Sequence, residues 1–274
     1  MRVLFIGDIV GTSGQSAIEK YLPQLKKHYR PQFTIANGEN ISNGRGISEK
    51  LYKWLLNQGV NAITLGNHAF DNRDIFNFIE DAQSLIRPYN LPKKTPGQGV
   101  RFIKVNEIEL AIINVLGNAF MNASQEVFQS LIDLVDTVKE RTKHIIIDIH
   151  AEASSEKQAI AWLFDGKVTA VLGTHTHVQT KDARILDGGT AYITDVGTTG
   201  SIQSIIGFKP TDVIHRFVSQ LPVRLEESIS NHVLLSAVYL DINDRTGLTT
   251  RIEPIYLTDK KYTHQPTSMK ATEI

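Results

Sequence analysis

The chain alternates short apolar runs with longer segments in which apolar residues recur every three or four positions. The runs have the length of buried strands, and the segments between them have the period of amphipathic helices. This alternation is typical of strand–helix–strand units that form a largely parallel sheet. The predicted strands span 2–7, 33–36, 62–66, 144–149 and 168–173, and the predicted helices span 13–29, 48–58, 72–80, 124–141 and 154–164.

The rest of the chain adds a hairpin and a group of later strands. Segments 101–105 and 109–115 are strand-like and separated by three residues, which predicts an antiparallel hairpin and therefore a mixed sheet. After Asp182, strand patterns predict a second sheet packed on the first. Because no linker rich in Pro, Gly or Ser divides the chain, we expect one domain over 1–257 and a polar tail over 258–274, either an arm on a partner or disordered. The later strands are predicted at 183–186, 190–194, 232–242 and 249–256, and a helix at 211–220.

Composition excludes several kinds of chemistry. The 274 residues include no cysteine, which excludes disulfides, cysteine-ligated zinc, iron–sulfur clusters and a thiol nucleophile. The 29 Lys and Arg residues equal the 29 Asp and Glu residues, whereas proteins that hold a nucleic-acid duplex need a clustered positive excess. The first apolar run, Val3–Ile6, is too short for a signal peptide, and no apolar stretch approaches about 18 residues. We expect a cytoplasmic protein with no membrane segment and no duplex partner.

Polar side chains follow five of the predicted strands, each directly after a small residue or at the end of the strand. The carboxyl ends of parallel strands share one edge of a sheet, where open α/β folds bind their ligands. These five strand ends are therefore expected to converge. The residues concerned are Asp8, Glu39, Asn40, Asn67, His68, His150, His175 and His177.

A convergence of carboxylates and imidazoles needs a source of positive charge. Such groups at a partly buried edge would repel one another or lose hydration at a cost of several kcal/mol, unless cations neutralised them. Seven carboxylate, amide and imidazole ligands are too many for one tetrahedral ion, but they suit two ions roughly 3.5–4 Å apart that share a carboxylate. Nitrogen and oxygen donors without sulfur favour transition metals over magnesium or calcium. The sequence therefore predicts a dinuclear site, with iron or manganese as the expected metals.

Each of these residues has an ordinary explanation when it is taken alone. A single Asp after a strand, such as Asp8, is most often a helix cap or a turn residue. His68 and His150 are individually more typical of hydrogen-bonded histidines than of catalytic ones. The pair His175 and His177 is harder to explain without a ligand role. Because five independent ordinary explanations would have to hold together, we favour the metal site.

Phosphate contacts are predicted less firmly by the sequence. Gly7–Gly14 could form a phosphate loop, but its glycine spacing matches neither the dinucleotide fingerprint nor the Walker A loop. The amino end of the following helix could still help to hold a phosphate. Arg45 and Arg73 are candidate phosphate contacts, although each is more typical of a surface or helix-stabilising arginine.

The ordered motifs resemble those of the calcineurin-like metallophosphoesterases. That family has Asp-x-His, Gly-Asp-x-x-Asp, Gly-Asn-His-Glu/Asp, an isolated His and Gly-His-x-His. This chain departs from the pattern, since Val10, Glu39, Ala69 and Thr174 stand where the family has His, Asp, an acidic residue and Gly. The departures resemble the YmdB-like subfamily, to which nearly the whole chain through about residue 257 is similar. The shared motifs are Asn-Gly-Glu-Asn at 37–40, Gly-Asn-His-x-x-Asp at 66–71, His-Ala-Glu at 150–152 and Gly-Thr-His-Thr-His-Val-Gln-Thr at 173–180.

The resemblance implies a four-layer α/β/β/α sandwich with two mixed sheets, two transition-metal ions and a homo-oligomer. By position, Asp8 and His177 would bind one ion and Glu39 would bridge the two. Asn40 is the least secure ligand, since it would fill the gap left by Val10. The second ion would be bound by Asn67, His150 and His175.

The resemblance also implies hydrolysis of small phosphodiesters, with 2′,3′-cyclic nucleotides as the substrate class. A hydroxide bridging the ions would attack phosphorus in line, and His68 would protonate the leaving oxygen as a general acid. Two alternatives stay open. One is a non-catalytic nucleotide-sensing regulatory protein, and the other is a phosphomonoesterase or 5′-nucleotidase on the same scaffold.

Overall fold

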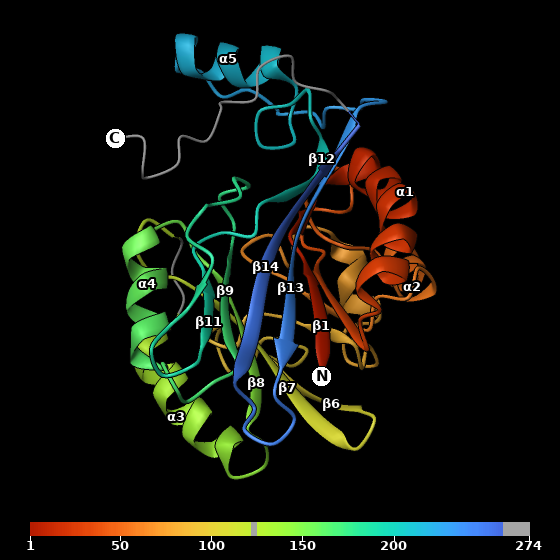
Figure 1. Cartoon of the computed structure of the whole chain (residues 1–274). Helices are drawn as coiled ribbons and strands as arrows, with labels where there is room; N and C mark the ends of the chain where they lie inside the picture. The colour runs from red at the N-terminus through yellow and green to blue at the C-terminus, as the bar shows by residue number, and fades with distance from the viewer. Residues whose placement is uncertain (122–124, 260–274) are drawn as a thin grey trace, which may run out of the picture.

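Two mixed β-sheets pack face to face, and helices cover the outer side of each (Figure 1). The computed structural model describes residues 1–121 and 125–259. The larger sheet contains β1 (Arg2–Ile6), β2 (Asp8–Ile9), β3 (Phe33–Asn37), β4 (Ala62–Thr64), β5 (Leu85–Ile86), β12 (Thr198–Ser201), β13 (Val233–Ile242) and β14 (Thr249–Thr258). The smaller sheet contains β6 (Val100–Val105), β7 (Ile108–Leu116), β8 (His144–His150), β9 (Ala170–Thr174), β10 (Arg184–Ile185) and β11 (Ala191–Ile193).

Four of the helices form the outer layers, which completes the predicted α/β/β/α sandwich. They are α1 (Gly11–Tyr29), α2 (Glu49–Asn57), α3 (Val127–Lys139) and α4 (Ser154–Leu163). Helices α1 and α2 lie against the larger sheet, and α3 and α4 lie against the smaller sheet (Figure 1). Two further helical segments are the 3₁₀ helix η1 (Arg73–Asn77) and α5 (Pro210–Ser219).

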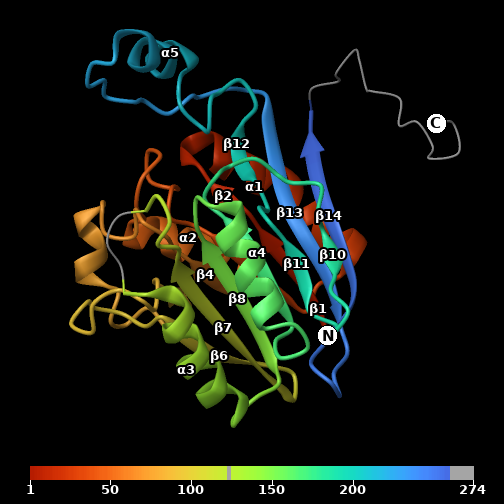
Figure 2. The ribbon, with the colours of Figure 1, turned by 90° about the vertical axis from the view of Figure 1, so that its left-hand side faces the viewer.

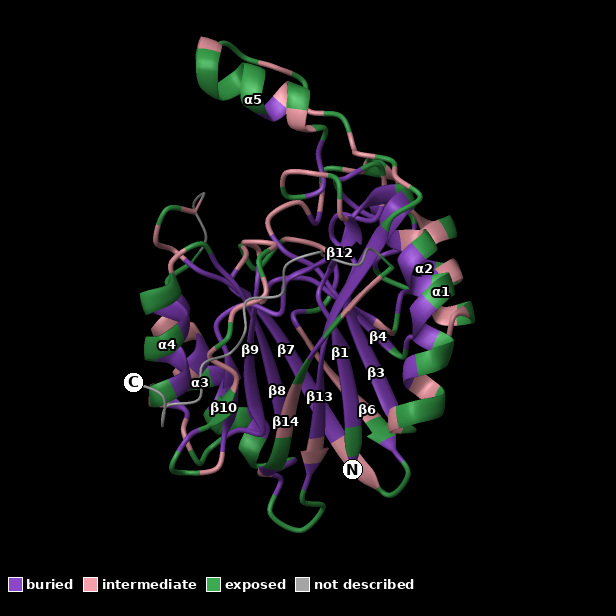
Figure 3. Cartoon of the chain, turned by 45° about the horizontal axis from the view of Figure 1, so that its top comes forward, coloured by how far each residue is buried: buried purple, intermediate pink, exposed green. Residues whose placement is uncertain are grey.

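Three apolar cores hold the four layers together. Strand β1 shows how one strand serves two of them, because successive side chains point to opposite faces of a sheet. Val3 and Phe5 are buried between the two sheets, whereas Leu4 and Ile6 are buried under α1 and α2. The third core lies between the smaller sheet and its two helices. Figure 3 shows that the central strands of both sheets are buried, whereas the edge strands β6, β10 and β14 and the outer helix faces are largely exposed or half-buried.

The strand order brings the carboxyl ends of five strands to one place. Strands β1, β3 and β4 run parallel in the larger sheet, and β7, β8 and β9 run parallel in the smaller sheet. The polar residues expected at one sheet edge therefore lie on two sheets that face each other. As a result, the two sheets can enclose a ligand from opposite sides.

The expectation that the strands after Asp182 form the second sheet is wrong. Strands β12, β13 and β14 join β1 in the larger sheet, and only β10 and β11 join the smaller one. The reason is the apolar character of β13, which is buried over nearly all of its ten residues and therefore occupies a central position, paired with β1, β12 and β14. The predicted hairpin is confirmed as the antiparallel pair β6–β7.

The helix predicted at 72–80 is only a five-residue 3₁₀ helix, η1. Its polar side chains bond to nearby groups, since the Asn72 side chain accepts from the Asp74 amide at 3.1 Å and Asp74 accepts from the Asn77 side chain at 3.2 Å. Such local bonds compete with a regular helix. Strands β2, β5 and β12 were not predicted, because two to four residues are too few to show a period.

Helix α5 projects from the sandwich on a long connection between β12 and β13 (Figure 2). Val213 is its one buried residue, whereas Phe217 and Val218 are 78 % and 80 % exposed.

The predicted tail begins at the end of β14, and residues 260–274 lie outside the described residues. Over the described part of the chain, every helix is too short or too polar to cross a membrane. The single domain over 1–257 stays a prediction.

Candidate metal centre

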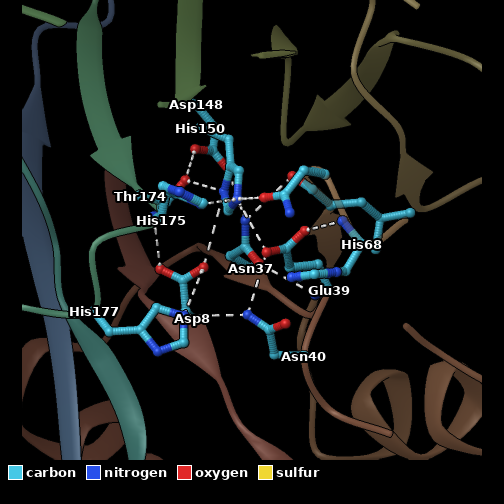
Figure 4. A network of polar contacts seen from close by, with 12 residues as sticks. Asp8, Asn37, Glu39, Asn40, His68, Asp148, His150, Thr174, His175 and His177 are labelled. Carbon is cyan, nitrogen blue, oxygen red and sulfur yellow. Dashed lines mark hydrogen bonds and ion pairs between the residues drawn. The ribbon is translucent and has the colours of Figure 1, made fainter. Parts of the chain in front are cut away.

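The residues predicted from the strand ends meet between the two sheets (Figure 4). Asp8 lies on β2 directly after β1, and Glu39 and Asn40 lie in the turn after β3. Asn67 and His68 follow β4. His150 ends β8, and His175 and His177 lie in the loop after β9.

One group of ligand atoms surrounds the Nε2 atom of His150. This nitrogen lies 3.0 Å from Glu39 Oε1, 2.9 Å from Asn67 Oδ1 and 3.0 Å from His175 Nδ1. One ligand atom from each of Glu39, His150 and His175 lies within 4.8 Å of the others. Three residue types that ligate transition metals thus present their atoms to one small volume.

A second group lies beside the first, around the Asp8 carboxylate. Asp8 Oδ1 lies 3.9 Å from His150 Nδ1 and 4.0 Å from His177 Nε2. The Asn40 side-chain nitrogen lies 3.2 Å from His177 Nε2 and 3.2 Å from Glu39 Oε1. Asp8 is fully buried, and its Oδ1 atom has no hydrogen-bond partner among the described residues. A buried carboxylate oxygen without a donor is costly unless a cation satisfies it.

Hydrogen bonds on the far side of each ring fix which imidazole nitrogen faces the cluster. His150 Nδ1 lies 2.9 Å from Thr174 Oγ1, whose own hydrogen goes to Asp148 at 2.6 Å, so Nδ1 is the protonated nitrogen. His177 Nδ1 donates to the Ile206 carbonyl at 2.9 Å. His177 therefore directs the lone pair of Nε2 to the cluster, as a metal ligand requires. The Nε2 atom of His150 also faces the cluster, but in the metal-free protein it carries a proton that a metal would displace.

His175 shows the same arrangement with the two nitrogens exchanged. Its Nε2 atom lies 3.2 Å from a Glu152 carboxylate oxygen. An ionised carboxylate can only accept a hydrogen bond, so Nε2 carries the hydrogen. Its Nδ1 atom therefore presents the lone pair to the cluster beside His150. Three histidines, two from one loop and one from a strand end, thus turn a ring nitrogen toward one centre, which fits a metal site.

The charges of the site favour a cation. Burial opposes protonation of His150, but Glu39, Asp8 and Asp148 together raise its pKa to about 9. Burial alone would raise the pKa of Glu39, yet the charge and hydrogen bond of His150 lower it to about 2. Burial raises the pKa of Asp8 well above its usual range, and three neighbouring carboxylates add to this effect. The cluster therefore binds positive charge strongly, here as a proton.

The backbone of the histidine loop is unusual. His175 has φ 101° and His177 has φ 65°, a region that few residues other than Gly adopt, although Asn, Asp and His do so more often than most. Such positions cost of order 1–3 kcal/mol each and persist where surrounding contacts fix them. With this backbone, the His175 ring contacts His150 while the His177 ring contacts Asn40.

A cavity of about 280 Å³ opens directly onto the cluster. Glu39, Asn40, His175 and His177 form its polar floor, and His68 lines it as well. Phe208 and Ile206 add an apolar wall from the segment before α5. The cavity thus joins candidate ligands, an imidazole outside the two groups and an apolar surface.

His68 lies near the cluster, and among the described contacts its ring does not touch the nitrogens of His150, His175 or His177. Its amide donates to Glu39 Oε2 at 2.9 Å, and its Nδ1 atom lies 2.8 Å from Asp71 Oδ2. The carboxylate of Asp71 orients the ring. This arrangement suits a proton donor better than a ligand.

The structure does not support the weaker phosphate contacts. Arg45 and Arg73 are exposed, and neither is among the described residues that line the cavity. At the amino end of α1, a protein carboxylate takes the place considered for a phosphate. Glu227 accepts from the Thr12 amide at 3.0 Å and from its hydroxyl at 2.9 Å.

Sequence reasoning missed several residues that organise the centre. Asn37 accepts from the Glu39 amide at 3.2 Å and donates to Asp148 at 3.3 Å, so it links the two sheets. Asp148 and Glu152 orient histidines through the contacts described above. Asp148 interrupts an apolar strand and was therefore detectable as an anomaly, and Glu152 lies in the His-Ala-Glu motif.

The four layers and the polar strand ends define a metallophosphoesterase. Within that class the chain belongs to the YmdB-like family, whose model matches residues 4–255. It is 48 % identical over 259 residues to the 2′,3′-cyclic-nucleotide 2′-phosphodiesterase of Bacillus subtilis, covering 94 % of this chain and 98 % of that one.

Solved structures agree with this assignment. A structure described as a novel phosphatase from Mycoplasma pneumoniae has a TM-score of 0.89 at 34 % identity and covers 94 % of this chain and 93 % of its own. A structure described as a candidate 5′-nucleotidase from Staphylococcus aureus has a TM-score of 0.62 at 14 % identity, covering 97 % of this chain and 56 % of its own. The second likeness shows the fold alone.

Replacing Asp8 by Asn separates stability from metal binding. In chelator-treated protein, we expect Asp8→Asn to raise the free energy of unfolding by about 1 kcal/mol, or the melting temperature by about 2–4 °C, because it removes a buried charge among other carboxylates. The amide oxygen can still accept from the His175 amide, as Asp8 Oδ2 does at 3.2 Å. Differential scanning calorimetry measures the change.

The same variant should bind metal at least about 100-fold more weakly, since supporting residues alone are worth 10–100-fold. Exposed Asp136 on α3 provides the control, and Asp136→Asn should alter neither quantity. A lower melting temperature of metal-free Asp8→Asn would contradict this account of the site.

Proposed function

We propose that this protein is a dinuclear metal-dependent phosphodiesterase that hydrolyses small phosphodiesters, with 2′,3′-cyclic nucleotides as its substrates. The observation that carries the proposal is the close approach of ring nitrogens of His150, His175 and His177 to the carboxylates of Asp8 and Glu39 beside one cavity. The activity named for the Bacillus subtilis relative supports the substrate class.

Two groups of residues are proposed to hold two divalent transition-metal ions. Asp8 and His177 would hold one ion, and Glu39, which lies between the groups, would serve both. Asn40 would join the first ion through its amide oxygen after its side-chain amide turns over, because the amide nitrogen faces His177 here. When bound, iron or manganese ions would activate water and neutralise charge on the phosphoryl oxygens. The second ion is assigned to Asn67, His150 and His175.

The chain itself supplies the proton for the leaving group. His68 lines the cavity, and Asp71 holds its Nδ1 atom at 2.8 Å. The Nε2 atom is therefore the nitrogen that can donate to the departing alkoxide oxygen. General acid catalysis of this kind contributes typically 10²–10⁴-fold. Asp71 acts through His68 by holding the orientation of its ring.

The size of the cavity limits the substrate. Its volume of about 280 Å³ lies near the lower end of ligand pockets, which span roughly 300–1,000 Å³. Phe208 and Ile206 provide an apolar contact for the part of a nucleotide beyond the phosphate. A small diester fits these dimensions.

The predicted absence of a duplex nucleic-acid partner and of a membrane partner, and the cytoplasmic location, stay predictions.

A phosphomonoesterase is the second candidate, because the solved Mycoplasma pneumoniae relative is described as a phosphatase. A regulatory protein that binds nucleotide without turnover is the third. Both would use the same ligand residues, so the reaction itself has to be measured.

A matched pair of chromogenic substrates distinguishes the three. With manganese present, we expect bis-(p-nitrophenyl) phosphate to be hydrolysed with a kcat/KM at least about tenfold above that of p-nitrophenyl phosphate, and a chelator to abolish both reactions. Preference for the monoester would establish the phosphatase. Nucleotide binding without hydrolysis of either substrate, or of 2′,3′-cyclic AMP, would establish the regulatory protein.

The variant His68→Ala tests the proton donor. Turnover of a 2′,3′-cyclic nucleotide should fall about 10²–10⁴-fold, because its leaving group is an alkoxide that needs a proton. Elemental analysis of anaerobically purified protein should find iron or manganese in the wild type, and the His68→Ala variant should contain the same amount of that metal. His28→Ala, on the exposed side of α1, serves as the control. Loss of metal from His68→Ala would instead make His68 a ligand, and the absence of iron and manganese from wild type would overturn the metal assignment.

We also propose that the chain forms a homo-oligomer, and the exposed apolar side chains of α5 support this (Figure 3). A helix of about ten residues is marginal in water without packing, and α5 buries one residue against its own chain. Phe217→Glu combined with Val218→Glu should reduce the mass measured by light scattering. An oligomer of unchanged mass would place the interface elsewhere, and a monomeric wild type would refute the oligomer.

A further inference from the structure

A fully buried ion pair lies beneath the metal centre and has no part in the proposed chemistry. Lys157 on α4 and Asp195 after β11 both have side chains that are 0 % exposed, and Lys157 Nζ lies 2.9 Å from Asp195 Oδ2. Buried lysines are rare unless they are paired, because removing an ammonium group from water is costly. The pair therefore needs a reason for its position.

The other side-chain hydrogen bonds of this pair go to the histidine loop and to Gly197, which in turn contacts Asp8. Lys157 Nζ also donates to the Thr174 carbonyl at 2.7 Å, at the residue before His175. Asp195 Oδ2 accepts from the Thr176 amide at 3.0 Å and from its hydroxyl at 2.8 Å. Thr176 is the residue between the two histidines, so the pair holds the loop at its start and at its middle.

Asp195 extends the same network to the next part of the site. Its Oδ1 atom accepts from the Gly197 amide at 2.8 Å, and the Gly197 carbonyl in turn accepts from the Asp8 amide at 3.0 Å. Its backbone carbonyl accepts from the Thr180 amide at 3.0 Å, beyond the histidines. Asp195 thus connects the middle of the loop, through its carboxylate, and the far end, through its backbone carbonyl, with the strand that carries Asp8.

The loop needs such support because of its backbone. His175 and His177 both have positive φ, and neither has a glycine's freedom to adopt it. Thr176 turns its hydroxyl inward to Asp195, so the histidines on either side point to different contacts, His150 for one and Asn40 for the other.

We propose that Lys157 and Asp195 are positioning residues that clamp the histidine loop in the conformation that delivers His175 and His177 to separate groups of ligand atoms. The part of this inference that concerns metal binding rests on the proposed function. The part that concerns the loop holds for the metal-free protein.

The first test uses amide hydrogen exchange in the chelator-treated wild-type protein. The Thr176 amide is predicted to be strongly protected, because it donates to a buried carboxylate that is itself paired. The double variant Lys157→Met/Asp195→Asn removes both charges together. In this variant the protection of the Thr176 amide against exchange should fall by at least about tenfold. Exchange of the wild-type Thr176 amide at the rate of an unstructured peptide would overturn the clamp.

The second test uses cobalt(II), whose visible absorption reports the geometry of its ligands. The double variant should bind cobalt about 10–100-fold more weakly, as is typical when residues that orient ligands are lost, and its absorption spectrum should change. Leu131→Ala, in the core under α3, provides a control that is destabilised without touching the loop. The control should keep the wild-type affinity and spectrum.

The outcomes separate this inference from the proposed function. Wild-type affinity and spectrum in the double variant would overturn the clamp while leaving the metal site intact. A wild-type protein that binds no cobalt would contradict the proposed function, and the exchange of the Thr176 amide would still decide whether the clamp exists. If the double variant fails to fold, the wild-type exchange measurement alone decides the clamp.

Discussion

The structure depends on a cluster of buried negative charge that its own chain only partly neutralises. Asp8, Glu39, Asp148 and Asp195 are all buried where the two sheets meet. Lys157 balances one of them, and His150 is driven to hold a proton by the others. Like charges at such short range in a poorly hydrated interior are unfavourable unless cations lie between them. The arrangement is therefore explained by metal binding better than by stability.

The topology places this cluster in a region that solvent reaches from one side only. Two sheets pack over an apolar core, and their parallel strands end together at one rim, so each sheet contributes part of the ligand set. The loops at the rim carry the chemistry while the strands beneath them fix the loops in place, as Asn37 and Asp148 do across the two sheets. This division between a rigid base and a variable rim is common in enzymes.

The sequence predicts the long strands of the sheets and the helices of the outer layers well, because their apolar patterns are long and regular. It also predicts which polar residues gather, because each follows a strand directly. The strand assignment after Asp182 could not be predicted, since β13 joins β1 through contacts far apart in the chain. The 3₁₀ segment at Arg73–Asn77 escaped prediction because side-chain bonds of Asn72 and Asp74 override an apparently helical pattern. The burial of Lys157 could not be predicted, because a lysine in an amphipathic helix is normally expected on the solvent-exposed face.

The proposed ligand residues come from strand ends spread from Asp8 to His177, and this spacing has a consequence for biosynthesis. A nascent chain that has not yet emerged past β9 lacks His175 and His177, so it can assemble only part of the ligand set. Because a multi-ligand site of this kind does not exist in an unfolded chain, the free energy of metal capture is added to the finished fold alone. Loaded metal would therefore mark molecules in which the strand ends of both sheets have come together.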